Sequence, residues 1–361
     1  MAGARRTGMQ AFDYDLPPDL IAQEPLADRS GSRLLLLPRD EGAPEHHRFN
    51  ELPDLLDPGD LLVVNDTRVQ PARLSGNRHS GAEVEILLLR DLGAATWRTL
   101  IRPWRRLREG ERVVIRSRSG KLESGATIVE KLPEGEAVVR LDPAVHQSLE
   151  AYGRVPLPPY IDRQLEDDDR YQTVYAERTG SAAAPTAGLH FTPEVFDRLA
   201  GRNIAIASVT LHVGLDTFRP VTSEFAEDHR IHSEWCHVPE ATVGAIGDTR
   251  TCGGKVIAVG TTTARTLESF GRDWDGSRIQ AFEGMTDIFI TPGFEWKITD
   301  GLITNFHLPR STLLLMVSSL VGRERMLDAY QEAIRQRYRF FSFGDAMLIL
   351  GRTATTSGTP R

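Results

Sequence analysis

Cysteine and long hydrophobic runs are scarce in this sequence. Two cysteines among 361 residues are too few for a disulfide framework, which fits a reducing compartment. The longest apolar run, residues 313–321, is interrupted by two serines and is shorter than the roughly 20 residues that span a bilayer, so we expect a buried helix or strand. The first ten residues lack the apolar segment of a secretory signal. These absences predict a cytoplasmic protein with a flexible N-terminal extension, and we expect a monomer.

An excess of positive charge is also absent. The formal net charge of −7 argues against a protein that coats nucleic acid through bulk electrostatics. Two local clusters remain: residues 101–121 carry seven arginines with Lys121 and Trp104, and residues 335–341 mix arginine with Tyr and Phe. Arginine beside aromatic rings suits phosphate contacts and base stacking, whereas a solvated strand face is the commoner explanation. The sequence leaves both interpretations open.

The hydrophobic pattern divides the chain into two domains. Between residues 61 and 141 short β-type runs recur without a convincing helix, which is typical of a barrel or sandwich: LLVVN, AEVEILLL, TWRTLI, RVVIRS, ATIVEKL and EAVVRL. Beyond residue 190 strands and helices alternate. The pattern there predicts strands at 203–213, 255–260, 287–291 and 301–306, and helices opening at Pro239, over 261–270, and along the face of Leu327, Tyr330, Ile334 and Tyr338.

We therefore predict an α/β main domain with a mostly parallel central sheet, interrupted by an inserted all-β barrel domain. The main domain is expected to comprise residues 1–60 and 152–350, and the barrel residues 61–151. Residues 351–361 form a polar tail that we expect to be disordered.

The segment AAAPTAGLHF, residues 182–191, places His190 behind residues of very small volume. Glycine permits close backbone approach and proline fixes one dihedral angle, so the segment is predicted to form a rigid, shaped loop. A tight connection packed on the core, with His190 hydrogen-bonded and inert, is the alternative.

The segment AVGTTTARTLES, residues 258–269, ends a buried strand at Gly260 and begins a helix. Backbone N–H groups and the hydroxyls of Thr261 and Thr262 would then lie at the carboxyl edge of a parallel sheet, where anions bind, with Arg265 in the first turns of the helix. Simple N-capping by threonine is the competing explanation. The segment is neither a P-loop nor a G-x-G-x-x-G fingerprint, which gives little support to mononucleotide hydrolysis or hydride transfer.

The segment AEDHRIHSEWCH, residues 226–237, combines carboxylates with histidines. Asp228 and Glu234 are suited to holding an ammonium group while one of the neighbouring histidines moves protons. No standard zinc spacing is present, so we expect no metal. Hydrogen bonding with a purely structural role is the alternative.

The segment TNFHLPRS, residues 304–311, places Asn305 and His307 at the end of a predicted strand, before a helix that Ser311 or Thr312 would cap. All these polar segments fall at strand ends in one α/β half. That is where α/β sheets bind their ligands.

Several motifs in order along the chain carry a family resemblance. They are FDYDLPPDLIAQEP, DRSGSRLL, NDTRVQPARL, PLPPYIDR, PTAGLHF, TLHVG followed by TFRPV, EDH followed by HSE, AVGTTTARTLES, TNFHLPRSTLL and RYRFFSFGDAM. With them the chain resembles the S-adenosylmethionine:tRNA ribosyltransferase-isomerase family of the queuosine pathway, from about residue 12 to residue 348. The resemblance also implies an α/β domain interrupted by a β-barrel.

The resemblance implies a specific reaction. The ribosyl part of S-adenosylmethionine moves to the aminomethyl group of 7-aminomethyl-7-deazaguanine at a tRNA wobble position, epoxyqueuosine forms in the tRNA, and adenine and methionine leave. S-adenosylmethionine is thus expected as the ribosyl donor and tRNA as the partner. No metal, redox cofactor or membrane contact is implied.

This chemistry needs proton carriers and a site for the donor. We assign His190 and His232 to proton transfer and Asp228 or Glu234 to the aminomethyl cation. The predicted donor site comprises Thr186, Gly188, Gly260, Thr261, Thr262, Arg265, Asn305 and His307. In it Thr261, Thr262 and Arg265 would bind the methionine carboxylate or ribose hydroxyls, and the tight backbone at residues 185–188 would make room for a flat base.

Three positions depart from the family pattern: Asp216, Thr263 and Phe343 stand where glycine, serine and tyrosine are common. Asp216 adds a charge near the predicted site. The alternatives are another S-adenosylmethionine-dependent transferase acting on RNA or a deazapurine, such as a methyltransferase, a non-catalytic tRNA-binding protein, and the same chemistry on a free deazapurine. A missing glycine-rich loop counts against a methyltransferase, and the intact histidine-bearing motifs count against a protein without catalysis.

Overall fold

The computed structural model describes residues 6–163, 165–214, 223–229, 231, 233–276 and 278–351. The chain forms two compact units, one of Met1–Arg68, Pro159–Arg178 and Ala184–Arg361, the other of Val69–Pro158 and Thr179–Ala183. Three of the sequence predictions, those for Asp216, His232 and residues 352–361 of the tail, lie outside the described residues.

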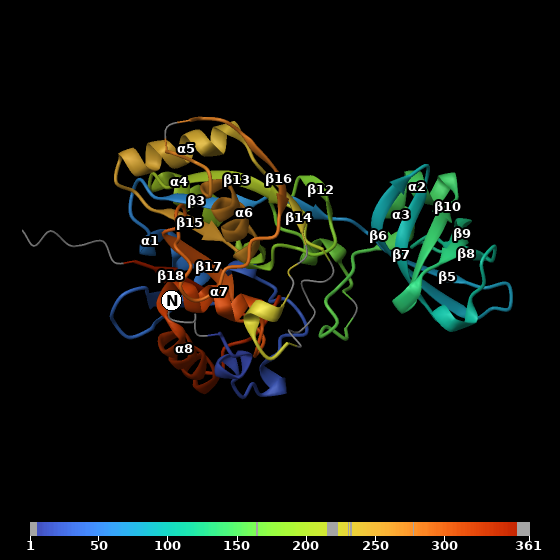
Figure 1. Ribbon diagram of the computed structural model, residues 1–361, viewed down its shortest axis with the longest axis horizontal. Coiled ribbons are helices and arrows are strands. Elements are labelled where there is room, and N and C mark those ends of the chain that lie inside the picture. Colours follow the sequence, from blue (N-terminus) through green and yellow to red (C-terminus); the bar gives the residue numbers. More distant parts are fainter. Residues whose placement is uncertain are drawn as a thin grey trace, which may run out of the picture. The chain divides into compact units, whose positions relative to one another are not determined.

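The larger unit is built on a nine-stranded mixed sheet (Figure 1). Its strand order is β16 (Phe282–Thr286), β14 (Glu234–Val238), β13 (Ala205–Leu211), β3 (Leu61–Asn65), β15 (Val256–Val259), β17 (Gly301–Asn305), β18 (Ala346–Leu350), β1 (Arg33–Pro38) and β2 (Glu45–Arg48). The central strands β13, β3, β15 and β17 are parallel. β18 runs antiparallel to β17 and parallel to β1, and the outer pairs are antiparallel.

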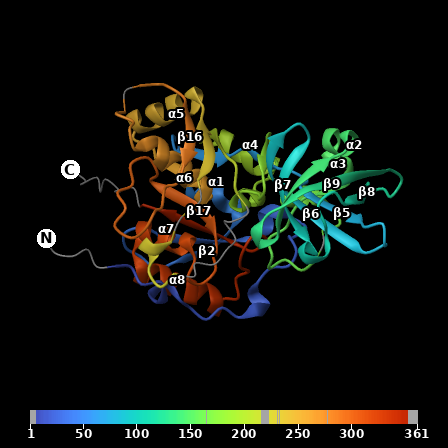
Figure 2. The same ribbon diagram turned by 45° about the vertical axis from the view of Figure 1, so that its right-hand side comes forward.

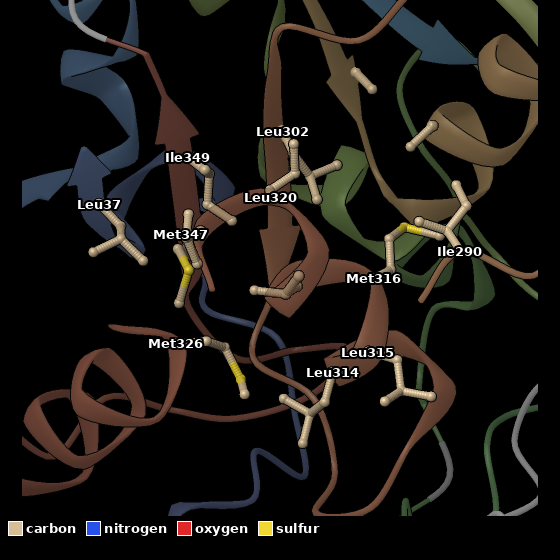
Figure 3. Packing of buried hydrophobic residues seen from close by; sticks show 14 of the residues in the cluster. Leu37, Ile290, Leu302, Leu314, Leu315, Met316, Leu320, Met326, Met347 and Ile349 are labelled. Atoms are coloured by element: carbon tan, nitrogen blue, oxygen red, sulfur yellow. The ribbon is translucent and has the colours of Figure 1, made fainter. Parts of the chain in front are cut away.

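Helices cover both faces of this sheet and create two cores. Leu61 and Val63 point into a core with α5 (Glu240–Thr251), α6 (Thr261–Gly271), α7 (Thr312–Val321) and α8 (Arg323–Arg335). Leu62 and Val64 point to the opposite core, with α1 (Leu52–Leu55) and α4 (Pro193–Gly201). Figure 3 shows how side chains of α7 pack toward Leu302, Met347 and Ile349 of the sheet in the first core. Successive strand residues alternate between the two faces, so continuous apolar runs such as LLVV fill both.

The smaller unit is a closed antiparallel barrel. β5 (Arg73–Asn77), β6 (Glu83–Gly93), β7 (Thr96–Arg102), β10 (Glu136–Leu141), β9 (Glu123–Lys131) and β8 (Arg112–Arg116) follow one another around it, and pairing of β5 with β8 closes the ring. The short β11 (Gly153–Arg154) adds to β5, and α2 (Pro143–Gln147) and α3 (Leu149–Tyr152) follow β10. Figures 1 and 2 show the barrel strands from two sides. Alternating buried residues of these strands fill the interior.

The predicted α/β domain with an inserted β-barrel is confirmed, and most of the elements predicted beyond residue 190 are present. The predicted strands at 203–213, 255–260 and 301–306 correspond to β13, β15 and β17, the helix at 261–270 to α6, and the apolar run 313–321 to α7. Among the described helices, none combines the length and the apolar character that crossing a bilayer would require.

Two details of the prediction are wrong. Residues 61–65 belong to the large sheet, as β3, and not to the barrel. The strand expected at 287–291 lies at Phe282–Thr286 instead, while Ile288 and Ile290 are buried outside any strand. In the central sheet, β13, β3, β15 and β17 are parallel as expected, while β2, β14, β16 and the β17–β18 pair add antiparallel strands. Two short strands, β4 (Thr67–Val69) and β12 (Arg178–Ser181), form a separate pair.

Candidate active site

The carboxyl ends of the central parallel strands present polar residues at one edge of the sheet. β3 ends at Asn65, β17 at Asn305, and β15 is followed directly by Gly260. The Asn65 side chain accepts from the Leu211 backbone N–H at 3.1 Å, and Gly260 N–H donates to the Ile303 carbonyl at 2.8 Å. These bonds hold the strand ends together, at the edge where open α/β sheets bind ligands.

His190 lies at this edge, in a short 3-10 helix over Thr186–His190. Its Nδ1 is 2.8 Å from Ser32 Oγ, and its Nε2 is 3.3 Å from Asn305 Nδ2. Thr186 Oγ1 donates to Asn305 Oδ1 at 2.8 Å, which directs the amide nitrogen of Asn305 toward His190. Nε2 is therefore the acceptor, and Nδ1 carries the proton and donates to Ser32.

The charge state of His190 follows from its burial. The residue is 5% exposed, and burial, together with the nearby cations Arg339 and Arg29, lowers its pKa to about 4. The imidazole is thus neutral at neutral pH, so it is able to accept a proton there.

Gly188 allows the backbone of this turn to lie against Tyr175. A Cβ at position 188 would lie 1.9 Å from Tyr175 Oη and 2.9 Å from Thr173 Cγ2. The hydroxyls of Tyr175 and Thr173 are buried and have no hydrogen-bond partner within the described part of the chain. Close approach of the backbone to Tyr175 therefore explains the glycine at position 188.

Helix α6 begins at the same edge. Its N-cap is Gly260, with φ of +91° and no side-chain cap, so the threonine cap considered for this segment is not formed. Thr262 Oγ1 accepts from Asn65 Nδ2 at 3.2 Å, while Thr263 Oγ1 donates back to the Val259 carbonyl at 2.7 Å. The first intrahelical bond is from Ala264 N–H to Gly260, and the amides before it have no intrahelical acceptor. They form an anion-attracting helix start.

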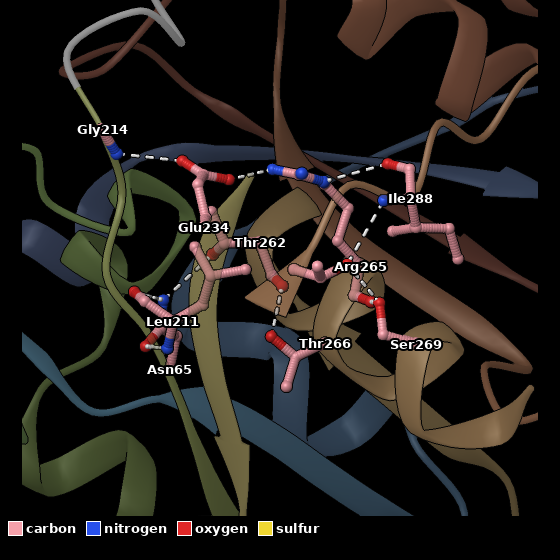
Figure 4. A network of polar contacts seen from close by, with 10 residues as sticks. Asn65, Leu211, Gly214, Glu234, Thr262, Arg265, Thr266, Ser269 and Ile288 are labelled. Carbon is pink, nitrogen blue, oxygen red and sulfur yellow. Dashed lines mark hydrogen bonds and ion pairs between the residues drawn. The ribbon is translucent and has the colours of Figure 1, made fainter. Parts of the chain in front are cut away.

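A buried ion pair links α6 to β14 (Figure 4). Glu234 Oε2 pairs with Arg265 Nη1, and Glu234 Oε1 accepts from Gly214 N–H at 2.9 Å. The two side chains are 6% and 10% exposed. Arg265 Nε also donates to the Ile288 carbonyl at 3.3 Å, and Nη2 is buried without a partner among the described residues.

Two predicted residues do not join this group. Asp228 lies in a short 3-10 helix over Ala226–Asp228, is half exposed, and pairs with Arg6. His307 is buried on the side of Thr304 and Tyr330: its Nε2 is 2.7 Å from Thr304 Oγ1, and its backbone N–H donates to Tyr330 Oη at 3.0 Å. Burial lowers the pKa of His307 to about 3.

Four polar residues of this edge were not predicted: Asn65, Asp66, Thr67 and His212. Thr210 Oγ1 donates to Asp66 Oδ1 at 2.6 Å, and Thr67 Oγ1 is 2.8 Å from His212 Nδ1. The sequence NDTR, a run of polar residues directly after a buried strand, is the pattern that indicates them, but the sequence pattern places that strand in the barrel. A small pocket next to His190 is lined by further residues of the same unit, among them Arg29, Ser32, Arg170 and Phe343.

Within the described ranges no group of three or more His, Cys, Asp or Glu side chains is arranged to hold a metal ion. The polar atoms at the edge belong to hydroxyls, amides, imidazoles and two carboxylates, of which Glu234 pairs with Arg265 and Asp66 accepts from Thr210. Such a set fits an organic ligand that carries hydroxyl and carboxylate groups.

Comparison with known proteins identifies the family. The model of the family described as queuosine biosynthesis protein matches residues 9–349. The chain belongs to this family. It is 52% identical over 347 residues to the S-adenosylmethionine:tRNA ribosyltransferase-isomerase of Symbiobacterium thermophilum, covering 94% of this chain and 98% of the relative. It is 49% identical to the enzyme of that name from Staphylococcus haemolyticus, covering 95% and 99%.

The family resemblance seen in the sequence is thereby confirmed, and a solved structure agrees. The crystal structure of S-adenosylmethionine tRNA ribosyltransferase from Thermotoga maritima is 38% identical to this queuosine-family chain. It matches with a TM-score of 0.55, over 94% of this chain and all of that one.

Proposed function

We propose that this protein transfers and isomerises the ribosyl moiety of S-adenosylmethionine onto 7-aminomethyl-7-deazaguanine at the wobble position of tRNA. Epoxyqueuosine-tRNA forms, and adenine and methionine are released. The observation that carries the proposal is the meeting of the family motifs at one sheet edge: PTAGLHF supplies Thr186 and His190, TNFHLP supplies Asn305, and GTTTAR supplies Thr262. The proposed setting is the cytoplasm, with the protein acting as a monomer.

His190 is proposed to be a base. Because burial lowers its pKa to about 4, the imidazole is neutral at neutral pH and is in the form that can accept a proton. Thr186 and Asn305 fix the tautomer that leaves Nε2 as the acceptor. The proton to be removed is the one next to the sulfonium, and Asn305 must give way for Nε2 to reach it.

Glu234 is the better candidate of the two carboxylates for the aminomethyl cation. It is buried beside Arg265, whereas Asp228 is half exposed and paired with Arg6 at the surface. A carboxylate removed from water attracts an ammonium group more strongly than an exposed one. His232 stays a proposed proton carrier on the segment between them.

The start of α6 is proposed to hold the donor. The amides of Thr261 and Thr262 precede the first intrahelical bond, and Arg265 has one buried guanidinium nitrogen without a partner in the described structure. These donors suit the methionine carboxylate. Gly188, Gly260 and His307 stay proposed parts of the donor site; in the structure Gly188 packs against Tyr175, and the His307 side chain hydrogen-bonds to Thr304.

Adenine release tests this function. The enzyme is mixed with S-adenosylmethionine and a tRNA anticodon stem-loop that carries 7-aminomethyl-7-deazaguanine, with an unmodified stem-loop and the free deazapurine as comparisons. We expect adenine only with the modified RNA, together with the matching mass gain on that RNA. Adenine release with the free deazapurine but not with the modified RNA would mean that the acceptor is a small molecule and not tRNA. A methylated product would identify a methyltransferase.

His190→Ala is the first variant to test. We expect it to abolish adenine release, because the proposed base is lost, while circular dichroism and thermal unfolding still report a folded protein. Ser32→Ala is the matched control, since it removes one partner of the same imidazole but leaves Nε2 in place. Turnover by His190→Ala at the wild-type rate would remove His190 from the mechanism.

A further inference from the structure

Three flat rings lie in a row where β13 ends and β14 begins. The rings of His212 and Trp235 are 5.0 Å apart between centroids, with 23° between their planes, and those of Trp235 and His237 are 6.2 Å apart with 7° between planes. All three side chains are partly exposed. Along β14, Trp235 and His237 alternate with the buried residues Glu234, Cys236 and Val238, so these two rings lie on the face of the strand that is turned away from the core.

Hydrogen bonds hold each ring by its edge. His212 Nδ1 is 2.8 Å from Thr67 Oγ1, and Trp235 Nε1 donates to Glu283 Oε1 at 3.3 Å. Arg178 Nη1 donates to His237 Nδ1 at 3.0 Å. The ring orientations are therefore set before any ligand arrives, which reduces the ordering cost of stacking against them.

The row begins at the candidate active site. Asn65 Oδ1 accepts from Thr67 N–H at 3.1 Å, and the same side chain donates to Thr262 at the start of α6. Thr67 in turn contacts His212, the first ring. A ligand seated at the start of α6 and one stacked on the rings would thus be neighbours in the same unit.

We propose that His212, Trp235 and His237 form a stacking platform for an unstacked nucleobase of the RNA substrate, with Arg178 placed for its phosphate. The proposal rests on the proposed function, in that the substrate is taken to be an RNA loop. An enzyme that modifies a base within such a loop must take nucleotides out of their stack, and aromatic side chains replace the lost stacking. Arginine beside the rings adds a phosphate contact.

Direct binding tests the platform without relying on turnover. The probe is a fluorescently labelled anticodon stem-loop, and its dissociation constant is measured for wild type, Trp235→Ala and Trp235→Phe. We expect Trp235→Ala to bind about tenfold more weakly, the size of one base stack, and Trp235→Phe to bind nearly as wild type, because it keeps a ring. Trp274→Ala is the matched control, since Trp274 packs against Phe270 instead, and it should leave RNA affinity unchanged.

A thermodynamic cycle then asks which base is stacked. Each loop nucleotide is replaced in turn by an abasic one, and binding to wild type and Trp235→Ala is compared. At one position we expect the abasic change to weaken RNA binding by the wild type but not by Trp235→Ala, since that variant already lacks the stacking interaction. Additive losses at every position, or unchanged RNA affinity in Trp235→Ala, would overturn the proposal.

The adenine of the donor is also a flat base, and a separate measurement distinguishes it. If Trp235→Ala raised the KM for S-adenosylmethionine while its RNA affinity stayed at the wild-type value, the rings would serve the donor and the proposal would be wrong. Wild-type enzyme that binds RNA on the platform yet releases no adenine would refute the proposed function alone.

Discussion

Two histidines are buried as neutral side chains, and each makes the stability of the fold depend on pH. Burial lowers the pKa of His190 to about 4 and that of His307 to about 3, against about 6.5 for an exposed histidine. Between pH 6.5 and the folded-state pKa the unfolded chain binds more protons, so stability is full above pH 6.5 and falls as the pH drops. Each histidine contributes a slope of roughly 1.4 kcal/mol per pH unit.

We expect His307→Gln to have a shallower loss of unfolding free energy between pH 6 and pH 4.5 than the wild type. The variant lacks the group that must stay neutral in the fold, although it loses some stability at pH 7 with the Thr304 hydrogen bond. Urea unfolding at several pH values measures both effects, with the exposed His79→Gln as the control. Parallel pH profiles for wild type and His307→Gln would contradict the assignment.

A side chain at position 188 would collide with Tyr175 and Thr173. The Cβ of Gly188→Ala would lie 1.9 Å from Tyr175 Oη, so the turn that carries Thr186 and His190 must shift. We expect a loss of about 1 to 3 kcal/mol in stability and a larger loss of activity. Tyr175→Phe removes the closest atom and should restore part of both, as thermal unfolding and adenine release would show. Wild-type behaviour of Gly188→Ala would mean that the turn is not tightly packed.

At the scale of elements, the Glu234–Arg265 ion pair ties helix α6 to strand β14. Removing one member of a buried pair leaves an uncompensated charge, which costs about 3 to 5 kcal/mol, whereas removing both costs much less. We expect Arg265→Met to be strongly destabilised and the double variant Arg265→Met/Glu234→Gln to recover most of the loss. A double-mutant cycle by chemical denaturation measures the coupling. Simple additivity of the two changes would show that the pair does not hold these elements together.

The elements that the sequence predicted well are those whose signals are local. β13 and β15 are nearly continuous apolar runs, and Gly260, whose positive φ is readily adopted by glycine, marks the boundary between β15 and α6. The sequence places β3 in the wrong domain because an apolar run of four residues, LLVV, does not indicate which sheet the strand joins. Because of that error, Asn65 was not recognised as a site residue. Which side chains meet at a sheet edge depends on how strands far apart in the sequence pair.

At the scale of the whole molecule, charge is divided unevenly between the two units. Residues 69–158 contain fifteen Lys and Arg and eleven Asp and Glu, a net charge of +4, so the rest of the chain carries −11. Several barrel arginines are neutralised by pairs such as Arg78–Glu111 and Arg112–Asp142. Arg102, Arg105 and Arg106 are exposed and form no ion pair with a described residue. We expect this local excess of positive charge to attract RNA phosphates.

The salt dependence of RNA binding tests whether the exposed arginines of the barrel contact RNA phosphates. Neutralising Arg102, Arg105 and Arg106 with glutamine should weaken binding of the anticodon stem-loop at low salt. It should also lower the slope of log affinity against log salt by about 0.7 to 0.9 for each phosphate that the variant no longer binds. The matched change in the acidic unit, Arg198→Gln with Arg202→Gln, removes cations that already pair with Asp54 and should leave the slope unchanged. Because counterion release depends on how many phosphates are neutralised regardless of sequence, an unaltered slope in the barrel variant would mean that the RNA backbone does not bind these three arginines.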